Sequence, residues 1–127
     1  MKRLLLFLLT VIFAAAGSAA ALSPAARTEI DALLSRLEAS ACEFNRNGSW
    51  YPAADAKSHL LRKLKYLEDR GAVQSTEQFI ELAASSSSTT GQPYLVKCGS
   101  GAPVQSGTWL RSQLQMVRSS GRAKGAP

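Results

Sequence analysis

The 127-residue chain is poor in the side chains from which metal centres and many catalytic centres are built. It holds a single histidine, His59, and two cysteines, Cys42 and Cys98. A protein zinc site takes three or four ligands, so no metal centre is expected, and nothing in the sequence indicates another cofactor. A cysteine nucleophile needs an activated thiol, and the only histidine lies far from both cysteines in the sequence.

The chain also lacks the dense basic stripe of a nucleic-acid-binding protein. Its formal net charge is +6, but Lys2 and Arg3 stand at the N-terminus, and Arg122 and Lys124 stand in the C-terminal tail. Nucleic-acid-binding domains gather Lys and Arg on one face or along one helix. We therefore expect no nucleic-acid partner. The two tail charges are also too few to hold the protein on a membrane surface by themselves.

No apolar run in the sequence is long enough to cross a bilayer as a helix. The run 4–16 is shorter than the ~20 residues that a spanning helix needs. It follows Lys2 and Arg3 and leads to Ala19-Ala20-Ala21, which fits an A-x-A cleavage site. This pattern predicts a secretory signal peptide over residues 1–21, with an uncleaved anchor as the alternative. We expect a periplasmic or secreted protein without a stable membrane anchor after cleavage.

The two cysteines are predicted to form a disulfide bond. An even number of cysteines in an exported chain favours pairing. A Cys42–Cys98 bond would stabilise the fold by about 4 kcal/mol in the chain-entropy model, which matters because a domain of this size has a marginal core. The Cα atoms of a disulfide lie within about 7 Å of each other. The bond would therefore place residues 94–98 beside residues 42–46.

Apolar residues recur with the 3.6-residue period of a helix in two long stretches of the chain. A helix is predicted over residues 25–41, where one face carries Ile30, Leu33, Leu34, Leu37 and Ala41. A second helix is predicted over residues 52–70, where one narrow arc carries Ala56, Leu60, Leu64 and Leu67. Gly71 follows as a natural helix stop.

Two further helices are predicted in the second half of the chain. Ser75 and Gln78 have the spacing of a capping box, which indicates a short helix over residues 75–84. A last helix is predicted over residues 107–118, with an inward face of Trp109, Leu110, Leu114 and Val117. The glycine-, serine- and base-rich residues 119–127 are predicted to form a disordered basic tail.

The segment between the first two helices carries a hairpin signal. Asn47-Gly48 is the residue pair that a type I′ turn prefers, because both central residues need positive φ. Residues 49–51 are the predicted return strand, and residues 94–98 read as a further strand. Asn47-Gly48-Ser49 also matches an N-glycosylation acceptor, which the bacterial character of the leader disfavours.

These elements predict a mainly α (α+β) fold. Three to four short helices pack around a small antiparallel β-hairpin or ribbon of two or three strands, tied by one disulfide. The globular part is predicted to be a single domain over residues 22–118.

Four blocks of the sequence resemble a known family. They are "CEFNRNG", "AADAKSHLLRKL", "TEQFIELAASSSSTTGQPYLVKC" and "WLRSQL", in this order. Over about residues 26–118 the chain resembles the bacterial exported family called domain of unknown function fifty-three twenty-nine. The resemblance implies a bacterial periplasmic or secreted protein with a disulfide. It implies no activity and provides no catalytic residues to transfer.

A formal catalytic set can be drawn around the single histidine. Asp55 and His59 are four residues apart on the second predicted helix, so their side chains can touch, and a serine of the 85–88 loop such as Ser86 could supply a nucleophile. Serine runs are usually plain loops, however, whereas a hydrolase places its serine on a rigid turn. The simpler interpretation is that His59 borders the core, with its ring bonded to a carboxylate and to a backbone carbonyl or a hydroxyl.

A binding surface is the other candidate. Aromatic residues beside Arg and Asn suit protein or glycan recognition, and the candidates are Arg46, Asn47, Trp50, His59 and Lys63. Trp50 could equally belong to the core. Lys63 lies within the apolar arc, so its stem is expected to pack while its ammonium reaches water, with an ion pair to Glu43 or Glu81 as the alternative.

The sequence favours a non-catalytic binding or interaction module of the bacterial envelope. Its partner could be an envelope protein, a cell-wall glycan or a small ligand. The alternative is a small hydrolase that uses Asp55, His59 and a serine of the 85–88 loop. The hydrolase needs a serine oxygen beside the imidazole, whereas the binding module needs an exposed aromatic or basic patch.

Overall fold

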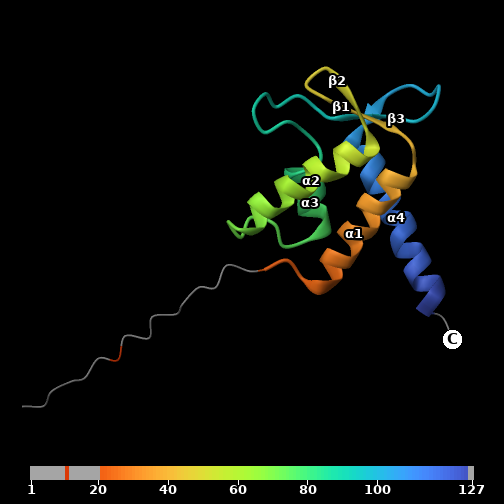
Figure 1. The fold of residues 1–127 in the computed structure, drawn as a ribbon. Coiled ribbons are helices and arrows are strands. Elements are labelled where there is room, and N and C mark those ends of the chain that lie inside the picture. The colour runs from red at the N-terminus through yellow and green to blue at the C-terminus, as the bar shows by residue number, and fades with distance from the viewer. Residues whose placement is uncertain (1–10, 12–20, 126–127) are drawn as a thin grey trace, which may run out of the picture.

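Helix α1 (Pro24–Ala39) lies at the centre of the helical layer. Ser23 caps it, since its Oγ accepts a hydrogen bond from the backbone N–H of Ala26 at 3.1 Å. Of the face predicted from the sequence, Ile30, Leu33, Leu34 and Leu37 are fully buried. Ala41, the last predicted member, is exposed, because the helix ends at Ala39 and Ala41 has a positive φ of 57°. This face contacts α2 (Ala53–Glu68), α3 (Thr76–Leu82) and α4 (Ser106–Gly125), so α1 holds the other helices together (Figure 1).

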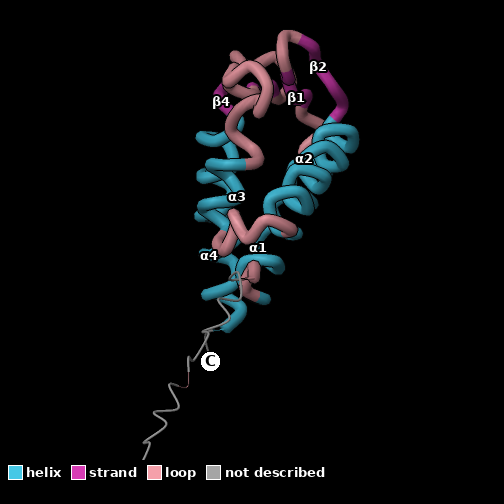
Figure 2. The backbone as a smooth tube through the Cα atoms, turned by 90° about the vertical axis from the view of Figure 1, so that its left-hand side faces the viewer, coloured by secondary structure: helices cyan, strands magenta, loops and turns pink. Residues whose placement is uncertain are grey.

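The computed structural model describes Val11 and residues 21–125. The signal peptide predicted for residues 1–21 therefore lies outside the described residues, apart from Val11 and Ala21. The described part contains four helices and one four-stranded antiparallel sheet. The sheet lies at one end of the helical layer (Figure 2). The predicted α+β class is thus confirmed.

The sheet is built outward from the predicted hairpin. Its strands are β1 (Glu43–Arg46), β2 (Ser49–Pro52), β3 (Leu95–Lys97) and β4 (Val104–Gln105), in the spatial order β2-β1-β3-β4. Asn47 and Gly48 have φ values of 52° and 84°, as a type I′ turn requires. Phe44 in β1 lies opposite Tyr51 and Val96. The two-residue strand β4 is an addition that the sequence did not predict.

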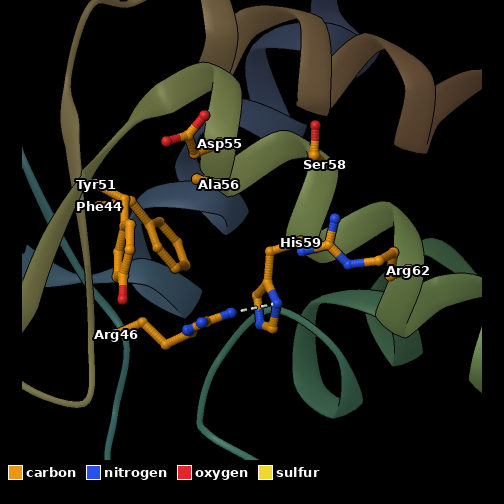
Figure 3. A pocket seen from close by; sticks show the side chains of 8 residues that line it. All are labelled: Phe44, Arg46, Tyr51, Asp55, Ala56, Ser58, His59 and Arg62. Atoms are coloured by element: carbon orange, nitrogen blue, oxygen red, sulfur yellow. Dashed lines mark hydrogen bonds between the residues drawn. The ribbon is translucent and has the colours of Figure 1, made fainter.

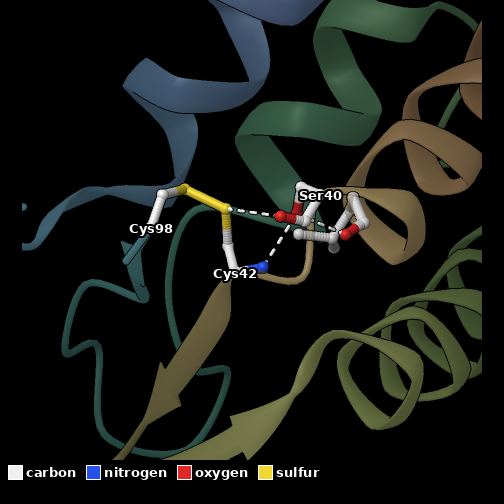
Figure 4. Close-up of a disulfide and its surroundings, with 4 residues drawn as sticks. Ser40, Cys42 and Cys98 are labelled. Carbon is white, nitrogen blue, oxygen red and sulfur yellow. Dashed lines mark hydrogen bonds between the residues drawn. A yellow bond between two sulfur atoms is a disulfide. The ribbon is translucent and has the colours of Figure 1, made fainter. Parts of the chain in front are cut away.

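The predicted disulfide between Cys42 and Cys98 is formed. The two Cα atoms are 4.3 Å apart, and 56 positions separate the residues in the sequence. The bond joins the residue before β1 to the residue after β3 (Figure 4). Beside it, the backbone N–H of Cys42 donates to Ser40 Oγ at 3.1 Å. The cross-link therefore fixes the adjacent ends of the two central strands.

Helix α4 is longer than the sequence predicts. We expected the helix to end at residue 118 and residues 119–127 to be disordered, but α4 continues to Gly125, while residues 126–127 lie outside the described part. Val117 packs against the core, and Arg118 is bonded to α1 and α3. Once a helix is anchored in this way, each further residue adds a backbone hydrogen bond for a small entropic cost.

The start of α4 lies very close to the loop that follows α3. A Cβ atom at Gly107 would lie 2.7 Å from Ser85 Oγ, which is too close for any other residue without a shift. Ser85 itself is held, since its Oγ donates to the carbonyl of Ile80 at 2.6 Å. The absence of a side chain at Gly107 thus lets α4 pack against the base of this loop.

Candidate functional site

A groove opens between the β1–β2 hairpin, α2 and the loop 86–93. Its volume is about 500 Å³, within the range of about 300–1,000 Å³ typical of small-molecule sites. Its lining includes three cationic side chains, namely Arg46, Arg62 and Lys63. We call it the cationic groove. It also contains His59, Tyr94, apolar atoms of Tyr66 and Leu67, and the loop residues 87–89.

A smaller cavity of about 260 Å³ adjoins the cationic groove. The two share Arg46, His59 and Arg62, and the smaller one is also lined by Tyr51 and Asp55 (Figure 3). Its walls come from the hairpin and from α2. The shared residues make the imidazole and its two neighbouring guanidinium groups the border between the cavities.

The His59 ring is fixed by one hydrogen bond at each nitrogen. Arg46 Nη1 donates to Nδ1, because a guanidinium has donors only. The ring proton of the neutral imidazole is therefore on Nε2, which lies 3.1 Å from Tyr94 Oη and donates to it. This arrangement sets both the tautomer and the orientation of the ring.

The surroundings of His59 keep the imidazole neutral. The pKa of His59 is lowered from 6.5 to about 4, mainly by burial and also by the positive charges of Arg46, Lys63 and Arg62. A neutral ring is what the Arg46 bond requires, since a protonated Nδ1 could not accept it. At neutral pH the imidazole thus links a cation to a phenol without carrying charge.

Tyr94 is the buried centre of the site. Its side chain is 1% exposed, and its ring packs against Phe44 with centroids 5.1 Å apart. Lys63 Nζ donates to Tyr94 Oη at 3.1 Å and to the carbonyl of Ser86 at 2.9 Å. Burial raises the pKa of Tyr94. Burial, together with the Arg46 charge, lowers the pKa of Lys63.

The observed hydrogen-bond partners of His59 and Lys63 differ in part from the expected ones. A hydroxyl does bind the imidazole, as expected, but the second partner is Arg46 instead of a carboxylate. Lys63 is bonded to a backbone carbonyl and a phenol, and within the described residues it forms no ion pair with Glu43 or Glu81. Lys63 as a whole is half-buried and lines the groove.

The three residues of the catalytic alternative do not form a hydrogen-bonded set. Within residues 21–125, neither Asp55 nor Ser86 forms a hydrogen bond with His59, and the Asp55 carboxylate points away from the ring (Figure 3). Ser86 contributes its backbone carbonyl to Lys63. Ser87 Oγ accepts from the backbone N–H of Thr90 at 3.3 Å and so holds its own loop.

Four of the five predicted binding residues line the cationic groove. Arg46, Asn47, His59 and Lys63 are brought together there, whereas Trp50 is 39% exposed in β2 and lines a different cavity. Sequence reasoning missed Tyr94, Arg62 and Tyr66 as members of the site, and it named the 85–88 loop only for the catalytic alternative. The spacing of Arg62 and Tyr66 from His59 on α2 is a local signal that could have added these two residues.

The loop wall of the groove is tied to the hairpin tip. Thr90 Oγ1 donates to Asn47 Oδ1 at 2.7 Å, so the tip of the loop is bonded to the turn of the hairpin. Ser86 and Pro93 form a β-bridge at the base of the loop. The wall is therefore held at both ends before any ligand is present.

The positive charges of the groove have no ion-pair partner in the part of the chain that the structure describes. Among residues 21–125, no carboxylate lies within ion-pair distance of Arg46, Arg62 or Lys63.

No group of three His, Cys, Asp or Glu side chains in the described part could hold a metal ion. None of the described helices is both long enough and apolar enough to span a bilayer.

Comparisons with known proteins identify the family to which the chain belongs. The chain is 47% identical over 51 residues to an uncharacterized protein, YfeK, of Salmonella typhimurium; this match covers 40% of the chain and 41% of YfeK. No solved structure matches the chain. Residues 24–118 match a family of unknown function, DUF5329, which accounts for most of the chain. The chain therefore belongs to the DUF5329 family.

Proposed function

We propose that this protein is a non-catalytic binding module of the bacterial envelope, and that it holds a small ligand or a cell-wall glycan fragment in the cationic groove. The observation that carries the proposal is the groove itself. It has the volume of a ligand site, and its walls are fixed by hydrogen bonds between segments that are far apart in the sequence.

The hydrogen bonding of His59 supports binding over catalysis. Both ring nitrogens are engaged with Arg46 and Tyr94, so neither is available to accept a proton from a serine. A general base must lie within hydrogen-bond reach of the proton that it removes. The imidazole instead positions the Arg46 guanidinium at the groove.

Two features support a periplasmic or secreted location. The Cys42–Cys98 disulfide is a bond that persists in oxidising compartments. The sequence of residues 1–21 fits a cleavable export signal. A protein exported in this way would meet cell-wall glycans and envelope proteins.

A thermal-shift screen tests the proposed function. The full chain, expressed in a bacterial host and purified, is heated with neutral and charged cell-wall glycan fragments and with small organic molecules. A ligand that binds only the folded state raises Tm in a concentration-dependent way. We expect at least one compound to do so with the native protein, and to lose this effect with the Arg46→Gln variant.

Two outcomes would contradict the proposal. One is a complete screen without stabilisation. The other is esterase or amidase turnover by the native protein that disappears in His59→Gln while the fold is retained. The second result would establish the hydrolase alternative in its place.

A further inference from the structure

We propose that the ligand of the cationic groove is an oxyanion, a carboxylate or a phosphate joined to a small apolar body. This inference rests on the proposed binding function and names its ligand class. It is carried by three cations that line one cavity without a carboxylate partner in the described residues.

The three cations still have donors to offer. A guanidinium has five N–H groups and an ammonium has three. Arg46 uses one on His59, and Lys63 uses two on Ser86 and Tyr94. The Arg62 guanidinium forms no hydrogen bond within the described part of the chain, although its backbone belongs to α2. Charge-assisted bonds from such groups to carboxylate or phosphate are shorter and stronger than bonds between neutral partners.

Two of the cations are already held in place. The Arg46 guanidinium is bonded to His59 and also lies over the Tyr51 ring, with Cζ 5.2 Å from the centroid. Lys63 is bonded to Ser86 and Tyr94 and lies 4.9 Å from the Tyr94 centroid. Side chains that are ordered before binding lose less entropy when the ligand arrives. These contacts therefore prepare the groove for a charged group.

The apolar part of the ligand is assigned from the apolar residues that line the groove on α2. Tyr66 is 57% exposed and Leu67 is half-buried, and both line the same cavity. The Arg70 guanidinium lies 3.5 Å from the centroid of the Tyr66 ring and supports it. An anion alone would leave these residues in contact with water, whereas a ligand with an apolar body would cover them.

An NMR titration of the full-length purified protein tests this ligand class. The probes are phenyl phosphate, benzoate, inorganic phosphate, and benzyl alcohol as a neutral aromatic. Phenyl phosphate and benzoate distinguish the two oxyanions, and inorganic phosphate tests the need for an apolar body. A neutral glycan fragment is the last probe, and it tests whether binding needs a negative charge.

Arg62→Gln is the test variant, and Arg111→Gln is its matched control. Both arginines are exposed on helices, and both substitutions remove one positive charge. Only Arg62 lines the groove. We expect amide shifts within the segments 46–47, 59–67 and 86–94 for the aromatic anions. Arg62→Gln should weaken their affinity on the order of tenfold, whereas Arg111→Gln should leave it unchanged.

Three other results would overturn the ligand class. Equal losses in the two variants would assign binding to the net charge of the protein. Benzyl alcohol or the neutral glycan fragment binding in the groove as tightly as the anions would refute the oxyanion and leave the binding function standing. No shifts with any probe, glycan fragment included, would refute both.

Discussion

Two arginines in distant parts of the molecule have opposite surroundings. Arg118, on α4, bonds to Glu29 of α1 at 2.8 Å and to Glu77 of α3 at 2.6 Å. Arg46, on β1, faces the neutral ring of His59. We call the first arrangement the Arg118 cluster; it also includes Thr76, which donates to Glu29 at 2.7 Å.

The pKa shifts of the two sites follow from this difference. The bonds to Arg118 lower the pKa of Glu29, and backbone and Arg118 bonds lower that of Glu77, because both carboxylates are stabilised in their charged form. In the cationic groove, burial and neighbouring positive charge lower the pKa values of His59 and Lys63. The Arg118 cluster is complete without a ligand, whereas the groove would gain from an anion.

Breaking the disulfide should have the largest effect, because it removes the cross-link at the sheet end while leaving the Arg118 cluster untouched. Cys42→Ser, Cys98→Ser and the double variant should each lose about 2–5 kcal/mol of unfolding free energy. Urea unfolding of the oxidised proteins measures this loss. The three values should agree, since each variant lacks the same bond; a double variant much less stable than either single one would contradict this.

Removing the imidazole should have the second largest effect. His59→Ala takes a hydrogen-bond donor from the buried Tyr94 hydroxyl and an acceptor from Arg46, so it should cost roughly 1–3 kcal/mol. His59→Gln keeps a donor and an acceptor and should cost less. Urea unfolding of both variants provides the measurement. Equal losses would mean that the ring contributes by packing alone.

A paired substitution sharpens the comparison directly. Arg118→Gln breaks two partly exposed ion pairs and should cost about 0.5–1 kcal/mol. Arg62→Gln removes a charge that has no carboxylate partner in the described residues, so stability should stay within about 0.5 kcal/mol of the native value. The two midpoints in urea give the answer. A larger loss from Arg62→Gln than from Arg118→Gln would reverse our assignment of the two sites.

The pH dependence of stability separates the two sites by their titrating groups. The pKa of His59 falls from 6.5 to about 4 on folding, so between these values the unfolded state binds more protons than the native state. The contribution of His59 to the unfolding free energy is complete above pH 6.5 and is lost as the pH falls toward 4. The lowered pKa values of Glu29 and Glu77 add a further loss below the ordinary carboxyl value of 4.5.

Thermal unfolding at a series of pH values separates these contributions. His59→Gln should flatten the change in Tm between pH 6.5 and 4.5 and leave the steeper loss at lower pH. Arg118→Gln should leave the change in Tm between pH 6.5 and 4.5 intact and reduce the loss at lower pH, because it removes the bonds to the Glu29 and Glu77 carboxylates. An unchanged profile in His59→Gln would show that the imidazole titrates normally in the native protein.

Local patterns predicted most of the fold. The buried face of α1 follows from the spacing of Ile30, Leu33 and Leu37, and the hairpin follows from Asn47-Gly48, because both features depend on neighbouring residues. Strand β4 has two residues and pairs only with β3, so it has no pattern of its own. The extension of α4 depends on the anchoring of Arg118 by residues of other helices.

The site was predictable only as far as residue type allowed. His59 and Lys63 were noticed because a lone histidine and a lysine in an apolar arc are unusual. Tyr94 gave no signal, since it is a single tyrosine before a short strand, 35 positions from His59. Arg62 looks like any solvated charge on a helix. Its significance comes from sharing a cavity with Arg46, which only the tertiary fold reveals.

The close approach of Gly107 to Ser85 has a consequence for how the sequence can vary. Ser85 directly precedes Ser86, whose carbonyl holds Lys63 at the groove. An alanine at position 107 would place its Cβ 2.7 Å from Ser85 Oγ, so the Ser85 side chain would have to shift from its hydrogen bond with Ile80, even though α4 does not line the groove. A homologue with a side chain at position 107 should therefore carry a smaller residue at position 85. The two positions should therefore vary together among relatives of this protein.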